Sequence, residues 1–374
     1  MNAGSHVAHV WVDDFFVAVE RQADATLRDR PVVVGGSADS PGRVVAASIE
    51  AMACGVVPGV RLRDAGNLCP DAAFLPGRLD RVLDAASLVD ETIRMVAGPV
   101  EWLAVDEAVL DLAQLDRVRA RRVAERIREA IGALGYAAAV GVADTRTAAR
   151  VAARMARPHG MLVVLPGYDG RFLSGLAPAC LGEIDPPTLD TLAGAGIDTL
   201  GTLAALSPQE AFALLGQPGP QLARRAAGED VRRVRPTPRP ARLCRVHRFE
   251  SDATPAQAAH AGEALVEDLA RALARFGCVA RGIGVRVEDA RGAAAARTVD
   301  VTPASGLSQA LMRVAVPLVT RLAAASPVRR LVVSAVQLSA DREQLALFRE
   351  VPPRAAVGFG GLPRAGSTGR SPRW

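Results

Sequence analysis

The sequence predicts a multidomain α/β protein of the α+β kind. Its 374 residues are too many for one typical domain. Strand and helix patterns alternate over residues 9–165, give way to short punctuated helices over residues 176–228, and return over residues 243–340. No apolar run approaches the roughly 20 residues needed to cross a bilayer. We therefore expect a cytoplasmic monomer.

The first region combines strands and helices along one stretch of chain. Apolar runs ended by glycine or proline indicate strands, and periodic apolar positions indicate helices. The expected strands are residues 9–13, 31–36, 42–47, two short ones within 100–112, and 137–142. The expected helices are residues 14–29, 48–55, 78–97, 116–134 and 145–155. This alternation is typical of a mixed sheet covered by helices.

The second region is helical and ends in a linker. Helices over residues 181–195 and 199–206 are joined by a glycine turn, and Ser207 to Glu210 has the pattern of a capping box. Two helices joined in this way form a helix-hairpin-helix. Residues 229–242 are rich in Pro and Arg, which predicts an extended spacer, either simply solvated or also touching phosphates.

The third region has the order β-α-β-β-α-β. The expected elements are strand 243–250, helix 255–276, strands 279–289 and 296–301, helix 307–325 and strand 328–338. The chain after about residue 350 is rich in Pro, Gly, Arg and Ser, which predicts a disordered tail.

Composition restricts the chemistry without choosing a function. All 45 basic residues are arginine and the net charge is +5, a modest excess that permits a phosphate-backbone partner without requiring one. The five cysteines are scattered, with no Cys-x-x-Cys pair, so a cysteine metal site and a disulfide framework are both disfavoured.

Several segments, in order along the chain, resemble motifs of the Y-family DNA polymerases of the DNA polymerase IV type. They are residues 9–20, 46–56, 75–80, 104–111 and 140–160. The resemblance implies a right-hand polymerase. Its parts would be a palm (1–14 and 77–165), fingers (15–76), a helix-hairpin-helix thumb (166–235), a linker (236–242), a little finger (243–340), and a clamp-binding peptide with the tail (341–374).

The resemblance also implies a two-metal site, but that site is incomplete. Two Mg²⁺ ions would be held by carboxylates of neighbouring strands. Asp106 and Glu107 match two of these ligands, whereas the opening Asp is replaced by Trp11, whose indole is only a donor. Asp13 shares the strand face of Trp11 and would reach a metal only if the strand shifted. Without the resemblance, Asp106 and Glu107 read as an ordinary acidic turn.

The implied nucleotide pocket is depleted as well. The family's triphosphate-binding Tyr and Arg correspond to Ile49 and Met52. Arg157 keeps a basic position, either as a phosphate ligand or as a solvated charge at a helix end. Phe16 matches the steric gate that excludes a ribose 2′-hydroxyl, although core packing is its favoured role. Because apolar residues replace polar ones at Trp11, Ile49 and Met52, we expect hydrophobic packing to have closed this pocket.

Other implied contacts concern DNA and a sliding clamp. In the hairpin at residues 182–188, Glu183 and Asp185 add negative charge where phosphate would bind, which puts that grip in doubt. The expected DNA-binding arginines are Arg242, Arg245, Arg248, Arg281, Arg286 and Arg297, with solvated surface charges as the alternative. The expected clamp-binding residues are Gln344, Leu345, Leu347 and Phe348.

Three functional hypotheses remain open. The first is a catalytically impaired or inactive translesion polymerase-like protein, nucleoid-associated, that binds damaged or primer-template DNA and the clamp and helps another DNA polymerase. The second is an active low-fidelity polymerase with a modified Mg²⁺ site formed by Asp13, Asp106 and Glu107. The third is a clamp-binding adaptor that does not grip DNA.

Overall fold

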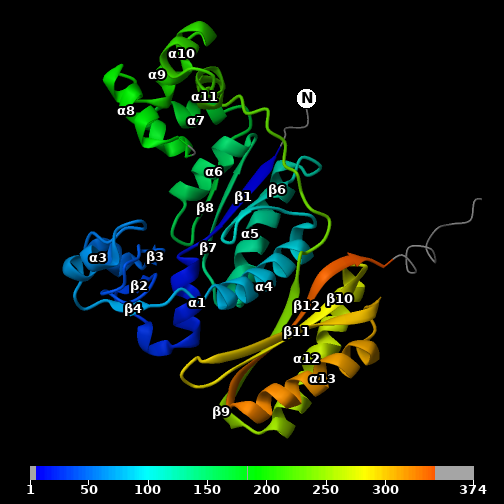
Figure 1. Cartoon of the computed structure of the whole chain (residues 1–374). Helices are drawn as coiled ribbons and strands as arrows, with labels where there is room; N and C mark the ends of the chain where they lie inside the picture. Colours follow the sequence, from blue (N-terminus) through cyan, green and yellow to red (C-terminus); the bar gives the residue numbers. More distant parts are fainter. Residues whose placement is uncertain (1–5, 183, 342–374) are drawn as a thin grey trace, which may run out of the picture.

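The computed structural model describes residues 6–182 and 184–341 of the chain. They form four units arranged around a central sheet (Figure 1). Within these residues no helix is both long and apolar enough to span a bilayer. The predicted clamp-binding residues 344–348 and the predicted tail lie outside the described part.

The central unit is a sheet of five strands in the order β5-β6-β1-β7-β8. The strands are β1 (Val7–Val12), β5 (Glu101–Ala104), β6 (Glu107–Asp111), β7 (Ala138–Ala143) and β8 (Met161–Val163). Alternate residues of β1 divide between two cores, with Val10 and Val12 in one and Val7 in the other.

Helices cover both faces of this sheet. The Val10 face packs against α4 (Leu79–Ala97) and α5 (Arg117–Ala133). The Val7 face packs against α6 (Arg146–Met155), whose backbone lies directly on β7. A Cβ atom at Gly141 would come within 2.1 Å of the Ala149 carbonyl oxygen, so only glycine permits this approach.

The small unit lies beside the central one. Its sheet has the order β3-β2-β4, from β2 (Val32–Val34), β3 (Ala46–Ala47) and β4 (Ala73–Leu75). Its helices are the short 3-10 turn η1 (Ala25–Leu27), α2 (Ile49–Ala53) and α3 (Leu62–Leu68). Helix α1 (Phe15–Ala23) joins the two units, since Phe15 packs into the central core and Val17 into the core of the small unit.

The helical unit continues the core formed under α6. It contains α7 (Asp169–Ser174), η2 (Pro178–Leu181), α8 (Pro186–Gly194), α9 (Leu200–Ala204), α10 (Pro208–Leu215) and α11 (Gly219–Ala226). The predicted helix over residues 181–195 is thus shorter than expected. Asp185 accepts a hydrogen bond from the Thr188 N–H and Pro186 occupies the first helical turn, which fixes the later start.

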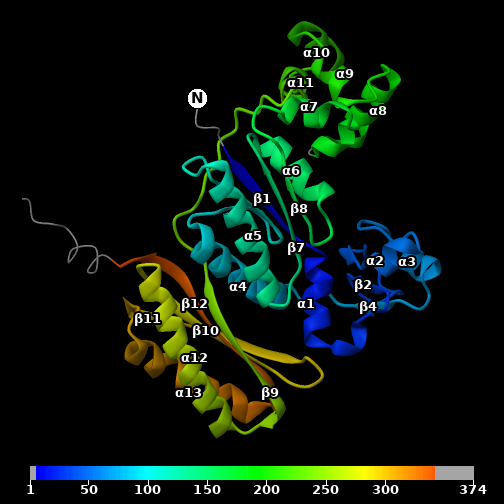
Figure 2. The same ribbon diagram turned by 180° about the vertical axis from the view of Figure 1, so that it is seen from behind.

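The C-terminal unit has the predicted β-α-β-β-α-β order. Its elements are β9 (Leu243–Ala253), α12 (Pro255–Arg275), β10 (Cys278–Glu288), β11 (Ala294–Ser305), α13 (Ser308–Ala325) and β12 (Val328–Ala340). The antiparallel sheet runs β11-β10-β12-β9. Both helices pack on one face of it, and the other face turns toward α4 (Figures 1 and 2).

The segment between the helical and C-terminal units is anchored to the central sheet. Thr237 forms an antiparallel bridge with Val100, and Arg94 donates to the Thr237 carbonyl at 2.6 Å. The Arg235 N–H also donates to Glu101. The predicted linker is therefore extended, but it lies along the edge of the sheet instead of standing free in solvent.

Candidate active site

The predicted catalytic residues meet where β1, β6 and β7 lie side by side. In the antiparallel register Trp11 stands directly opposite Glu107 on one side and Ala139 on the other. Since Val10 and Val12 point to the opposite core, His9 and Trp11 share the face covered by α6. The strand periodicity thus brings Trp11 and Glu107 together as the sequence predicts.

Glu107 is buried and already paired with an arginine and a histidine of its own unit. Arg150 on α6 donates from Nε to Oε1 at 2.7 Å, and His9 Nε2 lies 2.9 Å from the same oxygen. Burial alone would raise the pKa of Glu107, but the contacts with His9 and Arg150 outweigh it and lower the pKa. Burial lowers the pKa of His9, so its imidazole is neutral near pH 7.

Asp106, the neighbouring carboxyl, has a different environment. Burial raises its pKa, and the charge of Glu107 raises it further, while Arg157 and the Trp11 indole act in the opposite direction. A carboxyl that is harder to ionise is a weaker ligand for a hard cation. Asp106 and Glu107 therefore behave unequally, although they are adjacent in sequence.

Asp13 and Arg157 are bound to each other. Arg157 Nε donates to Asp13 at 2.6 Å, and the His159 N–H donates to the second oxygen at 2.8 Å. The same guanidinium reaches Asp14 at 3.3 Å and lies over the Trp11 ring, 5.0 Å from its centroid. Arg157 is thus neither a free phosphate ligand nor a solvated helix-end charge.

These residues do not fit the implied Mg²⁺ ions. Among residues 6–182 and 184–341 no group of three or more His, Cys, Asp or Glu side chains could hold a metal. The structure does not bring Asp13 together with Asp106 and Glu107 as a ligand set. Arg150 supplies Glu107 with the positive charge that a metal would provide, and Trp11 supplies no oxygen.

The expectation of a pocket closed by hydrophobic packing is wrong. Ile49 is 57% exposed and Met52 is 37% exposed on α2. Ser48 caps this short helix and Glu50 pairs with Arg21 at 2.8 Å, so α2 turns Ala51 inward and leaves Ile49 and Met52 at the surface. The position is therefore open, but it carries no group that can donate to phosphate. Phe16 is half-buried against the central core.

The glycine hairpin is built against Arg150. Gly182 has a left-handed φ of 61°, and a Cβ atom there would lie 2.6 Å from an Arg150 guanidinium nitrogen. Asp185 caps α8, so its carboxylate occupies the N–H groups that a phosphate would need. Residue 183 is not described.

The predicted DNA-binding arginines fall into two groups. Arg281 and Arg297 are exposed, as a DNA contact requires. The others contact the central unit or α1, contrary to the expectation that they face a DNA backbone. Their partners are Asp84 for Arg242, Glu91 for Arg245, Asp80 and Asp84 for Arg286, and the Gln22 carbonyl for Arg248.

A cavity of about 730 Å³ lies beside the turn that carries Asp106 and Glu107. Trp102, Leu103 and Val105 form one wall, and the linker around Thr237 forms another. Its lining is mostly apolar, and it contains neither Asp106 nor Glu107. The candidate site is therefore defined by its side-chain contacts and not by this cavity.

Arg150 and His9 were not among the residues that the sequence singled out. One signal was available, since Arg150 interrupts an otherwise small and apolar face of α6 formed by Ala148, Ala149 and Ala152. A charged residue on a face that packs against a sheet needs a partner there.

Comparison with known proteins agrees with this architecture. The chain matches the models of the impB/mucB/samB family at residues 10–154 and of its C-terminal domain at residues 242–347. A DNA polymerase IV of Dehalococcoides mccartyi is 34% identical over 249 residues, which are 66% of this chain and 64% of that protein. DNA polymerase IV 2 of Mesorhizobium japonicum is 36% identical over 241 residues, 63% of this chain and 56% of that protein. The matched region thus spans less than two thirds of these relatives.

Solved structures share the fold. DinB from Sulfolobus solfataricus has a TM-score of 0.58 and 20% identity, covering 88% of this chain and 98% of that one. An insertion ternary complex of Dbh DNA polymerase also has a TM-score of 0.58, with 19% identity and coverage of 90% and 99%.

Fold and sequence together define a Y-family DNA polymerase architecture. The chain belongs to the impB/mucB/samB family and resembles DNA polymerase IV. The fold of the four units as a whole matches these solved polymerase structures over 88–90% of this chain.

Proposed function

We propose that this chain is a translesion polymerase-like protein that engages primer-template or damaged DNA and has lost nucleotidyl transfer. The main support for the loss of catalysis is that Glu107 is paired with Arg150 and His9 and lies opposite Trp11 in the strand register. A two-metal mechanism needs several carboxylate oxygens directed at one point. Here the indole of Trp11 occupies one ligand position, and Arg150 of the same chain neutralises the charge of Glu107.

The nucleotide side of the site supports the same proposal. Arg157 is held by Asp13 and Asp14 and stacked on Trp11, and the exposed Ile49 and Met52 offer no donor to a triphosphate. A triphosphate would have to compete with two carboxylates that already contact Nε and one Nη of the Arg157 guanidinium. We therefore derive no metal-dependent step from this geometry.

Primer extension tests the proposal. Purified protein is given a primer-template, all four deoxynucleotides, and Mg²⁺ or Mn²⁺. We expect no extension above that of an Asp106→Ala/Glu107→Ala variant, which controls for contaminating polymerase. Extension by the wild type that this variant lacks would overturn the proposal and favour an active low-fidelity polymerase with a modified metal site.

Retention of DNA binding is a separate part of the proposal. The exposed Arg281 and Arg297 support it, as does the net charge of +5. Fluorescence anisotropy on a labelled primer-template should show binding that weakens steeply with added salt, since arginines that contact phosphate release counterions. Salt-insensitive or absent binding would leave a protein adaptor as the function.

Residues 344–348 would recruit the protein to a sliding clamp, where it would assist a second polymerase at a lesion. The support is the sequence Gln344-Leu-Ala-Leu-Phe348 directly after the C-terminal unit. Replacing Leu347 and Phe348 by alanine should abolish clamp binding in surface plasmon resonance and leave DNA binding unchanged. Unchanged clamp binding would reject this role.

A further inference from the structure

Helix α4 carries a stripe of polar side chains toward the C-terminal unit. Asp80, Asp84, Ser87 and Glu91 follow one another at intervals of four, three and four residues, which places all four on one face of the helix. At a rise of 1.5 Å per residue, Asp84 lies about 6 Å from Asp80 and about 11 Å from Glu91 along the helix axis. The stripe therefore presents a row of negative charge to the sheet that lies below it (Figure 1).

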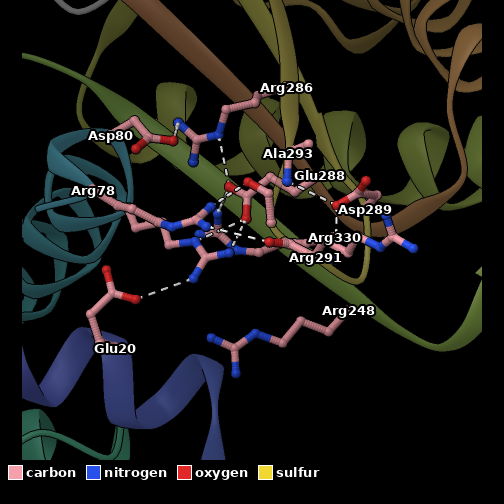
Figure 3. Close-up of polar contacts among 12 residues, drawn as sticks. Glu20, Arg78, Asp80, Arg248, Arg286, Glu288, Asp289, Arg291, Ala293 and Arg330 are labelled. Atoms are coloured by element: carbon pink, nitrogen blue, oxygen red, sulfur yellow. Dashed lines mark hydrogen bonds and ion pairs between the residues drawn. The ribbon is translucent and has the colours of Figure 1, made fainter. Parts of the chain in front are cut away.

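Arginines of the C-terminal unit pair with this stripe. Asp84 alone contacts three of them: Arg242 at 2.8 Å, Arg330 at 3.1 Å, and Arg286. Arg286 also reaches Asp80 at 3.0 Å. Figure 3 shows Arg286 and Arg330 extending from the sheet toward this helix, with Glu288 between them.

A second contact closes the edge of the sheet. Arg245 on β9 forms a two-pronged pair with Glu91, at 2.7 and 2.9 Å, and Ser87 donates to the Arg242 carbonyl at 3.0 Å. The buried Cys244 thiol donates to the Asp84 carbonyl oxygen at 3.2 Å. The interface therefore extends over more than two turns of α4.

These arginines are closed to solvent. The side chains of Arg286 and Arg330 are only 10% and 11% exposed, and that of Asp84 is 1% exposed. Strand alternation puts Arg286 and Arg330 on the face of the sheet that turns away from α12 and α13 and toward α4, called the arginine face below. Their neighbours Val285, Val287, Leu331 and Val333 pack under the two helices on the opposite face. A phosphate group cannot reach this face while α4 covers it.

We propose that α4 competes with the sugar-phosphate backbone of nucleic acid for the arginine face of the C-terminal unit, so that the described structure is a self-closed state. The inference rests on the proposed function in that it takes the polyanion to be DNA. The acidic stripe offers the arginines a regular row of anions from within the chain, as a nucleic-acid strand would from outside.

The arginine face needs an anion in either state. When α4 leaves, Arg242, Arg286 and Arg330 lose the carboxylate that they share, and Glu288 is the remaining acidic partner of the latter two. Close like charges without a partner repel one another. Arg248 donates to the Gln22 carbonyl at 2.6 Å, and burial and the nearby Arg330 lower its pKa. An open face without DNA is thus unfavourable, which makes closure and DNA binding alternatives.

The closing experiment compares two interface variants with one control. Asp84→Asn/Glu91→Gln removes two carboxylates of the stripe and leaves Asp80, and Arg245→Gln/Arg286→Gln removes two of the arginines that pair with it. Glu125→Gln/Glu129→Gln on α5 makes the same charge change as the first variant away from this interface. Alkylation of Cys244, followed by peptide mass spectrometry, reports opening, and the buried Cys69 of the small unit reports unfolding. Anisotropy on a labelled primer-template at fixed salt reports DNA binding.

Both interface variants should raise the alkylation rate of Cys244 without changing that of Cys69. They should change DNA affinity in opposite directions: about tenfold tighter for Asp84→Asn/Glu91→Gln, because the competent state becomes more populated, and weaker for the arginine variant. The control should match the wild type.

Three results would overturn the inference. Cys244 that stays protected in both interface variants would mean that these ion pairs do not hold the two units closed. Unchanged or weaker DNA affinity in Asp84→Asn/Glu91→Gln, with binding intact in the wild type, would reject competition and leave the proposed function standing. Absence of DNA binding in every variant would reject both.

Discussion

Replacing Glu107 by glutamine tests whether this carboxylate is a structural partner or a catalytic ligand. The substitution keeps the size of the side chain and removes its charge. In the structure Glu107 accepts from Arg150 at 2.7 Å and contacts His9 at 2.9 Å, with its side chain 9% exposed. A buried charge-assisted hydrogen bond contributes about 1.5–3 kcal/mol, and Arg150 is partly solvated, so we expect Glu107→Gln to lower the free energy of unfolding by about 2 kcal/mol near pH 7.

The effect should depend on pH in a definite direction. Because the pKa of Glu107 is lowered in the folded chain, its pairing stabilises the fold above the pKa of the unfolded side chain, about 4.3. That stabilisation is lost as the pH falls through the folded value. The difference between wild type and Glu107→Gln should therefore be full near pH 7 and shrink only as the pH falls below about 4.3.

Urea unfolding followed by tryptophan fluorescence suits this measurement, since Trp11 and Trp102 both lie in the central unit. A cycle with Arg150→Gln isolates the pair, and we expect a coupling of about 1.5–2 kcal/mol at pH 7. A coupling within error of zero would refute the assignment of Arg150 as the partner. Primer extension by the wild type that disappears in Glu107→Gln would refute the structural role itself.

Three further substitutions test neighbouring contacts. Trp11→Ala removes the surface over which Arg157 stacks and should lower the free energy of unfolding by about 1–2 kcal/mol in urea. Gly182→Ala puts a Cβ atom against Arg150 at a φ of 61°, and calorimetry should show a loss of about 1–2 kcal/mol. Arg281→Ala should weaken DNA binding and reduce the salt slope by about one, measured by anisotropy.

Two of these have matched controls in the chain. Gly194→Ala lies within α8, where an added Cβ atom meets nothing within 4 Å, so it should be neutral or slightly stabilising. A loss equal to that of Gly182→Ala would mean that the clash with Arg150 is not the cause. Arg126→Ala on the exposed surface of α5 should leave the salt slope unchanged, and an equal decrease would mean that Arg281 makes no particular contact.

Local patterns predicted most of the elements because their signals are local. Thr254 and Gln257 form a capping box that starts α12 at Pro255, as the sequence indicates. The period of two along β1 predicts that Asp13 shares the strand face of Trp11, whereas only the register seen in the structure places Trp11 opposite Glu107. The late start of α8 was missed because the capping role of Asp185 outweighs the apolar periodicity before it.

The contacts of the site depend on packing that no local pattern encodes. Arg150 reaches Glu107 only because α6 lies directly on β7 at Gly141. Ile49 and Met52 were expected to be buried because they are apolar, but apolar residues are also common at surfaces. The alternation along β10 predicts that Arg286 points away from the helices of its own unit. It does not predict the contact with Asp84 of α4, because that helix belongs to another unit.

Ion pairs within the chain thus occupy two places where an external ligand would bind. One is Glu107, and the other is the face of the C-terminal sheet toward α4. Different movements break the two sets of pairs. The pair of Glu107 with Arg150 lies within one unit, between β6 and α6, which share a single core. Separating it needs no movement of either unit but leaves a buried carboxylate without its partner, so a metal ion at Glu107 would have to compete with Arg150. The pairs between α4 and the C-terminal sheet join two units with separate cores, connected by the segment after Thr237. Those units can part as rigid bodies, because each keeps its own core when the arginines leave. Under the two proposals, the pair of Glu107 with Arg150 persists in both arrangements of the units, and only the pairs with α4 break when DNA binds.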